Sequence, residues 1–177
     1  MTPIYEIQSD LLKLLDEWKD FVWSLDMEKL QTRKGKFFRE DRSKFSTSIE
    51  CLNSMDHDTH DGFPPDSHGY DMNQMATWIR DNQIKDLDLA DRILEKSQWL
   101  DRELGGMLST RFCALKMFYP KDGYIAWHNN WNVPGYNILF TYTETGNGYW
   151  RHINPAGSKG SINKPLKDNL VHIPDVP

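Results

Sequence analysis

The residue pattern changes at Ser109, and this change constrains the fold more than any other feature of the 177-residue chain. Before Ser109, apolar residues recur every three or four positions, which is the spacing of amphipathic helices. After it, short apolar runs alternate with turns that contain proline and glycine, as in antiparallel strands. Helices first and strands second predict an α+β domain whose helices pack on an antiparallel sheet.

Three helices are predicted before the change. The first is capped by Ser9 or Asp10, and the others span 71–83 and 86–104, with Gly105-Gly106 expected to end the third. The apolar face of the first helix consists of Leu11, Leu12, Leu14, Leu15, Trp18, Phe21, Val22 and Leu25. We expect these helices to serve packing, without chemistry of their own.

The segments 30–55 and 56–70 are less regular. The first fits either a short helix or an edge strand, and the second is a loop by composition. The loop contains His57, His60 and His68, and alternating Asp and His residues can bind metal. Its spacing matches no defined calcium or zinc loop, so a solvated loop or a substrate lid describes it better.

Strands are predicted in the second part of the chain, at 110–119, 123–128, 136–142, 148–153 and 170–173. No internal repeat or low-complexity linker separates them from the helices. We therefore expect one domain over 1–177, with 1–108 as a helical layer and 109–177 as the sheet.

Composition excludes some classes of protein. A net charge of −5 gives no general affinity for nucleic-acid phosphates, and the basic segment 33–44 reads better as a solvated face around two phenylalanines. No apolar run is long enough to span a bilayer. Two cysteines far apart, without a secretory signal, predict a cytoplasmic protein without a disulfide framework.

The densest chemistry lies between Tyr119 and His152. His128 ends an apolar run, and Asn130 follows two positions later. In an extended chain, residues i and i+2 point to the same side, so both side chains can bind one metal ion. The alternative for the same residues is a hydrogen-bonded structural histidine followed by a polar turn.

The segment 110–155 contains a strand ending in Tyr-Pro, a Gly-bearing turn and His-x-Asn. A second strand ending in Tyr follows, and then a Gly turn with Trp-Arg. This order resembles the first half of the iron(II)- and 2-oxoglutarate-dependent dioxygenases, closest to the prolyl-hydroxylase-like branch and its phage-type relatives. The resemblance implies a jelly-roll-like double-stranded β-helix with helices packed on one side. It also implies a hydroxylase-like oxidoreductase acting on a small molecule or a protein side chain.

The resemblance assigns roles to five residues. His128 corresponds to the first Fe(II) ligand, and Asn130 occupies the position of the family's acidic ligand. His172, 44 residues beyond His128, is the candidate for the distal ligand. Tyr119 and Tyr142 match the tyrosines that bind 2-oxoglutarate. No further catalytic residue is assigned, and Trp150 and Arg151 fall near the implied substrate mouth.

The sequence departs from the family pattern in two ways. An amide oxygen at Asn130 can coordinate iron but is neutral. Asp122 and Glu144 are possible substitutes for the acidic ligand, although both lie outside the family pattern. No basic residue follows His172, where the family has one for the far carboxylate of the cofactor. We therefore expect a β-helix that is incomplete within these residues, its missing strands absent or supplied by a second chain or dimer partner.

Three function classes remain open. The first is the iron(II)- and 2-oxoglutarate-dependent oxygenase, or a degenerate or split version of it. The second is a non-catalytic binding or assembly module that keeps the β-helix shell, in which Tyr119 and Tyr142 are core tyrosines with satisfied hydroxyls. The third, less favoured by charge, is an oxygenase acting on nucleic-acid bases, with 33–44 as its phosphate contact.

Overall fold

The computed structural model describes residues 6–30, 40–55, 64–82, 86–113, 115–128, 138–153 and 170–174. In these ranges the chain forms helices and three small antiparallel sheets of two strands each, so its class is α+β, as predicted. The chain divides into two compact units. The first unit consists of Met1–Lys36 and Gly69–Lys121, and the second of Phe37–His68 and Asp122–Pro177.

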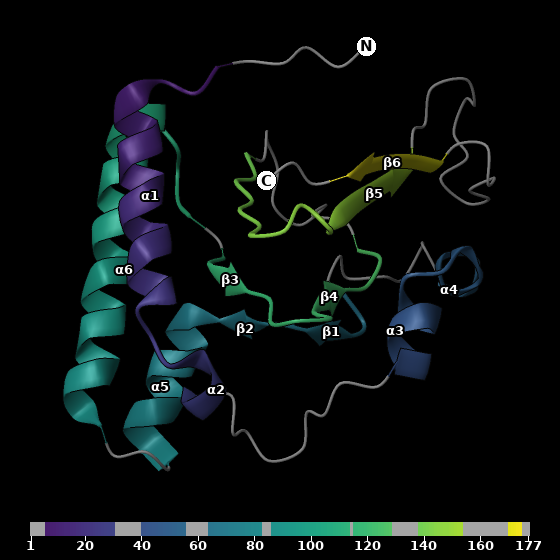
Figure 1. Cartoon of the computed structure of the whole chain (residues 1–177), viewed down its shortest axis with the longest axis horizontal. Helices are drawn as coiled ribbons and strands as arrows, with labels where there is room; N and C mark the ends of the chain where they lie inside the picture. The colour runs from purple at the N-terminus through teal and green to yellow at the C-terminus, as the bar shows by residue number, and fades with distance from the viewer. Residues whose placement is uncertain are drawn as a thin grey trace. The chain divides into compact units, whose positions relative to one another are not determined.

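The first unit is mainly helical. It contains α1 (Ser9–Trp23), α2 (Met27–Leu30), β2 (Tyr70–Asp71), α5 (Met72–Asn82), α6 (Leu87–Leu108) and β3 (Met117–Phe118). The long helix α6 packs against both α1 and α5 (Figure 1). Strand β2 pairs with β3 in antiparallel register, with Tyr70 opposite Phe118.

Aliphatic side chains from several helices form the core of the first unit. Ala76 and Ile79 of α5 are fully buried against Ala90 and Ile93 of α6. Complete burial of a side chain the size of isoleucine contributes about 1.5–3 kcal/mol. The predicted three-and-four spacing therefore identifies the faces that build this core.

The ends of α6 are set by different devices. At its start, Asp86 accepts a hydrogen bond at Oδ1 from the backbone N–H of Leu89 (3.0 Å), as a helix cap does. The prediction that Gly105-Gly106 ends this helix is wrong, because the helix continues to Leu108. Glycine lowers helix stability by about 1 kcal/mol without breaking the hydrogen-bond ladder, and Leu104, just before the pair, is buried. The helix ends at Ser109, whose φ of 52° leaves the helical conformation.

The predicted cap of α1 is also wrong. Helix α1 begins at Ser9, but the residue in the cap position is Gln8, whose side chain makes no capping hydrogen bond. Asp10 instead lies in the first turn, where its negative charge interacts favourably with the helix dipole. The apolar pattern therefore located the helix correctly but not the way its end is satisfied.

The second unit combines short helices with two-stranded sheets. It contains α3 (Glu40–Ser46), α4 (Ile49–Ser54), β1 (Ser67–His68), β4 (Tyr124–Ile125), β5 (Tyr149–Ile153) and β6 (Leu170–Pro174). Strand β1 pairs antiparallel with β4, with Ser67 opposite Ile125. Strand β5 pairs antiparallel with β6, with Arg151 opposite His172.

The strand predictions have mixed outcomes. Strands β5 and β6 confirm the predictions at 148–153 and 170–173, whereas the predicted strands at 110–119 and 123–128 shrink to two residues each. Residues 138–142, the described part of the remaining prediction, form no strand. A strand forms only where its backbone can hydrogen-bond to a neighbouring strand, and the apolar pattern of one segment does not show whether such a partner exists. None of the described helices combines the length and apolar character needed to cross a membrane.

Candidate functional site

His128 lies on the second unit, just beyond β4 and the buried Ala126. Its Nδ1 atom is 2.9 Å from the main-chain oxygen of Ala126. Because a carbonyl oxygen only accepts hydrogen bonds, we assign the proton to Nδ1, which leaves the lone pair of the neutral ring on Nε2. Metal-binding histidines are commonly oriented by such a bond to a backbone carbonyl. The exposed ring of His128 therefore fits the geometry of a metal ligand through Nε2.

The backbone before His128 is attached to Asp66. The N–H of Ala126 donates to the main-chain oxygen of Asp66 at 2.9 Å, directly beside the β1–β4 pairing. Ala126 therefore forms backbone bonds on both sides, receiving a hydrogen bond from His128 and donating one to Asp66. These two bonds connect the candidate ligand to the segment that precedes β1.

The carboxylate of Asp66 contacts hydrogen-bond donors from three segments. Its Oδ2 atom accepts from the Tyr124 hydroxyl (2.6 Å) and from Ser46 Oγ (3.3 Å), and lies 3.3 Å from Arg42 Nε. Its Oδ1 atom accepts from the backbone N–H of Ser67 at 3.0 Å. The side chain is only 21% exposed. Asp66 therefore joins α3, β1 and β4 at one point, and we call these five residues the Asp66 cluster.

The cluster changes the acid–base behaviour of two neighbours. Burial and the hydrogen bond to the Asp66 carboxylate raise the pKa of Tyr124 to about 12, although the Arg42 guanidinium opposes this shift. Burial, with a smaller contribution from Asp66, also raises the pKa of the Cys51 thiol. Tyr124 and Cys51 are therefore held in their neutral, proton-bearing forms at neutral pH.

Trp127 provides another attachment for the same strand. Its indole N–H donates to the main-chain oxygen of Ser48 at 2.7 Å. Ser48 in turn caps α4, since its Oγ accepts from the N–H of Cys51 at 3.1 Å. Trp127 thus connects the segment after β4 to the start of α4.

Tyr119 lies in the first unit, after β3. Its ring covers Gly69 so closely that a Cβ atom on that glycine would come within 2.7 Å of Tyr119 Cε1. Burial raises the pKa of the Tyr119 hydroxyl. This packing agrees with the alternative of a strand-end core tyrosine.

The other sequence-predicted site residues are placed as follows. Tyr142 is 58% exposed in the second unit. His172 is in β6, opposite Arg151, and its side chain lies outside the described atoms; Asn130 lies outside the described residues altogether. Among the residues that the structure describes, no group of three or more His, Cys, Asp or Glu side chains is placed to hold a metal ion.

Arg151 of β5 stacks on a neighbour from its own strand. Its guanidinium carbon lies 4.6 Å from the centre of the Tyr149 ring, and Nη2 donates to the Tyr149 hydroxyl at 2.5 Å. Residues two apart in a strand point to the same face, which brings the two side chains together. The guanidinium is therefore pre-oriented at the β5–β6 sheet.

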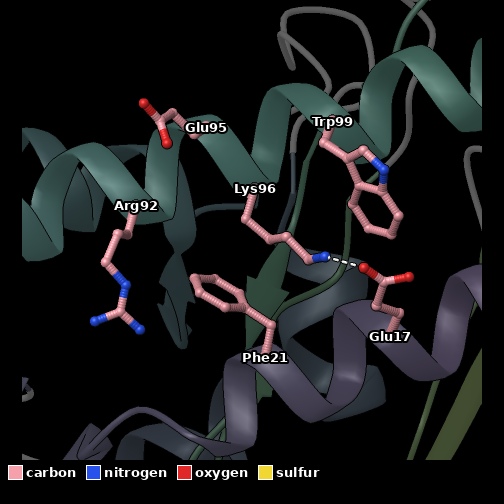
Figure 2. A pocket seen from close by; sticks show the side chains of 6 residues that line it. All are labelled: Glu17, Phe21, Arg92, Glu95, Lys96 and Trp99. Atoms are coloured by element: carbon pink, nitrogen blue, oxygen red, sulfur yellow. Dashed lines mark hydrogen bonds and ion pairs between the residues drawn. The ribbon is translucent and has the colours of Figure 1, made fainter.

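A separate hollow of about 450 Å³ lies between α1 and α6 in the first unit. Its lining consists of Glu17, Phe21, Arg92, Glu95, Lys96 and Trp99 (Figure 2). Lys96 extends from α6 to form an ion pair with Glu17 on α1, and its ammonium lies 3.6 Å from the centre of the Trp99 ring. The hollow contains none of the sequence-predicted site residues, and its central cation is already paired.

Sequence reasoning missed the Asp66 cluster. Asp66 stands in a loop with many acids, and no spacing distinguishes it from Asp56, Asp58 or Asp61. Comparisons with protein-family models, with curated proteins and with solved structures find no match to this chain. The site is therefore defined by its own geometry alone.

Proposed function

We propose that this chain is an iron(II)- and 2-oxoglutarate-dependent oxygenase domain of the hydroxylase type, with its metal site at His128. The observation that carries the proposal is the bond from His128 Nδ1 to the Ala126 oxygen, which leaves Nε2 available on an exposed ring. The order of motifs over 110–155 supports it. The implied fold of the strand-rich part is a double-stranded β-helix.

In this proposal, His128 Nε2, the amide oxygen of Asn130 and His172 hold the metal, and Tyr142 binds the carboxylate of 2-oxoglutarate. Iron(II) with a 2-oxo acid supplies the oxidising chemistry, and the protein supplies orientation and exclusion of water. The substrate is a small molecule or a protein side chain.

The test is metal binding by the anaerobically purified protein. We expect Fe(II) and Mn(II) to bind the wild type, and addition of 2-oxoglutarate to the Fe(II) form to produce a charge-transfer absorption band. His128→Ala should weaken binding by more than about 100-fold, because loss of an outer partner alone costs about 10–100-fold. His152→Ala is the matched control, since it removes an exposed histidine from the same unit.

A wild-type protein that takes up no metal, with 2-oxoglutarate present, would contradict the oxygenase proposal. The remaining reading would then be the non-catalytic binding or assembly module. Equal losses in His128→Ala and His152→Ala would likewise remove His128 from the site.

A further inference from the structure

We propose that Asp66 is the positioning residue for His128, and that its carboxylate fixes the tautomer and direction of the imidazole through the backbone of Ala126. The metal-binding consequence rests on the proposed function above, whereas the effect on the imidazole does not. Among the described residues, the contacts of Asp66 are with Arg42, Ser46, Ser67, Tyr124 and the Ala126 N–H rather than with the His128 ring, so its role is indirect.

The first step is that the carboxylate holds its own segment in place. The Tyr124 hydroxyl and the Ser67 N–H bind opposite oxygens of the carboxylate, at 2.6 and 3.0 Å. Ser46 and Arg42 add two contacts from α3. Hydrogen bonds to a charged carboxylate are stronger than those between neutral groups. The main chain at Asp66 is therefore fixed relative to both α3 and β4.

Two hydrogen bonds through Ala126 connect the Asp66 segment to the imidazole of His128. The main-chain oxygen of Asp66 binds the N–H of Ala126, and the oxygen of the same Ala126 receives the bond from His128 Nδ1. A displacement of the Asp66 segment rotates the Ala126 peptides and moves the acceptor away from Nδ1. The tautomer that exposes the Nε2 lone pair then loses its stabilising bond.

The Asp66 carboxylate has little capacity left to bind a metal ion itself. A carboxylate offers about four acceptor positions, and four donors already surround this one. Asp66 is therefore a poor substitute for the acidic ligand absent at position 130. Its arrangement is that of a support for a neighbouring ligand.

The experiment reads the tautomer directly, by long-range ¹H–¹⁵N NMR of the histidine rings at a pH where they are neutral. We expect His128 in the wild type to be the Nδ1–H tautomer. In Asp66→Ala, we expect a mixture of both tautomers at His128, with the resonances of His152 unchanged. Asp66→Asn retains acceptor oxygen and should partly restore the wild-type spectrum.

Asp86→Ala is the matched control. It removes an aspartate whose Oδ1 accepts from a backbone N–H at the same distance, 3.0 Å, but in the first unit. It lowers the melting temperature without disturbing Ala126, and we expect the His128 tautomer to remain that of the wild type. If Asp66→Ala does not fold, Tyr124→Phe replaces it. This variant removes a single donor from the Asp66 carboxylate, so we expect the second His128 tautomer to appear at a lower population than in Asp66→Ala.

A metal-binding measurement completes the test. Asp66→Ala, with His128 and Asn130 intact, should lower Mn(II) affinity by about 10–100-fold. If the wild type binds no metal, the proposed function fails while the NMR measurement still decides the role of Asp66. Folded Asp66→Ala or Tyr124→Phe with an unchanged His128 tautomer would overturn the inference, as would an equal change in Asp86→Ala.

Discussion

In the first unit, the buried residues that join α5 and α6 are mainly apolar, with one hydrogen bond from Ser97 Oγ to Asn73 Oδ1 among them. In the second unit, α3, β1 and β4 meet at the carboxylate of Asp66. Aliphatic contacts are non-directional and tolerate small shifts. Hydrogen bonds are directional and weaken steeply when the donor angle falls below about 120°. The second unit is therefore suited to holding one side chain, His128, in a defined orientation.

The largest expected effect tests the aliphatic side of this comparison. Leu100→Ala should lower the free energy of unfolding by about 2–5 kcal/mol, since Leu100 is 3% exposed and its loss leaves a cavity. Leu87, on the same helix, is 57% exposed, so Leu87→Ala should stay within about 0.5 kcal/mol of the wild type. Urea unfolding followed by circular dichroism measures both. Similar losses in the two variants would show that α6 is not held by burial of this face.

A second change tests a buried polar contact within the first unit. Lys116 is 2% exposed at its side chain, and its Nζ lies 2.6 Å from Asp101 Oδ1. Asp101→Ala leaves the buried ammonium without its carboxylate and should cost about 1–3 kcal/mol. Lys116→Met should cost less, because the Asp101 side chain as a whole is 39% exposed and can turn toward water, even though its Oδ1 atom is buried beside Lys116. Thermal unfolding of both variants checks this order, and a larger loss in Lys116→Met would contradict it.

A smaller effect is expected in the second unit. Tyr124→Phe removes the 2.6 Å hydrogen bond to Asp66 and should lower the unfolding free energy by about 0.5–1.5 kcal/mol. Tyr149→Phe is the matched control, because it removes an exposed hydroxyl bonded to Arg151 and should cost less. If urea unfolding shows equal losses of stability in Tyr124→Phe and Tyr149→Phe, burial at the Asp66 cluster does not strengthen the Tyr124 hydrogen bond.

Alkaline pH tests the hydrogen bond between Tyr124 and Asp66. The pKa of Tyr124 is raised from 10.0 to about 12 in the folded state. A raised folded-state pKa means that this stability is fully present below the unfolded value of 10.0 and is lost as the pH rises through about 12. The stability difference between wild type and Tyr124→Phe should therefore narrow over this range. Tyrosinate absorbance, as wild type minus variant, measures the pKa, and a value near 10 would contradict the prediction.

Much of the first unit follows from local sequence. The apolar spacing over 86–104 predicts α6, because a helix is built from contacts three and four residues apart. The end of α6 was not predictable from Gly105-Gly106, since packing around Leu104 outweighs the low helix propensity of glycine. Sequence also identified His128 as a candidate ligand, which stays a proposal.

By itself, the sequence determined the α+β class, the positions of the main helices and the strands at 149–153 and 170–174. Only the tertiary structure decided that Asp66, among many acids in its loop, accepts the Tyr124 hydroxyl, and that Lys116 is buried against Asp101. The physical reason is the separation along the sequence of the residues that are in contact. Helical periodicity is contained in adjacent turns, whereas Asp66 and Tyr124 are 58 positions apart and their contact leaves no local pattern in the sequence.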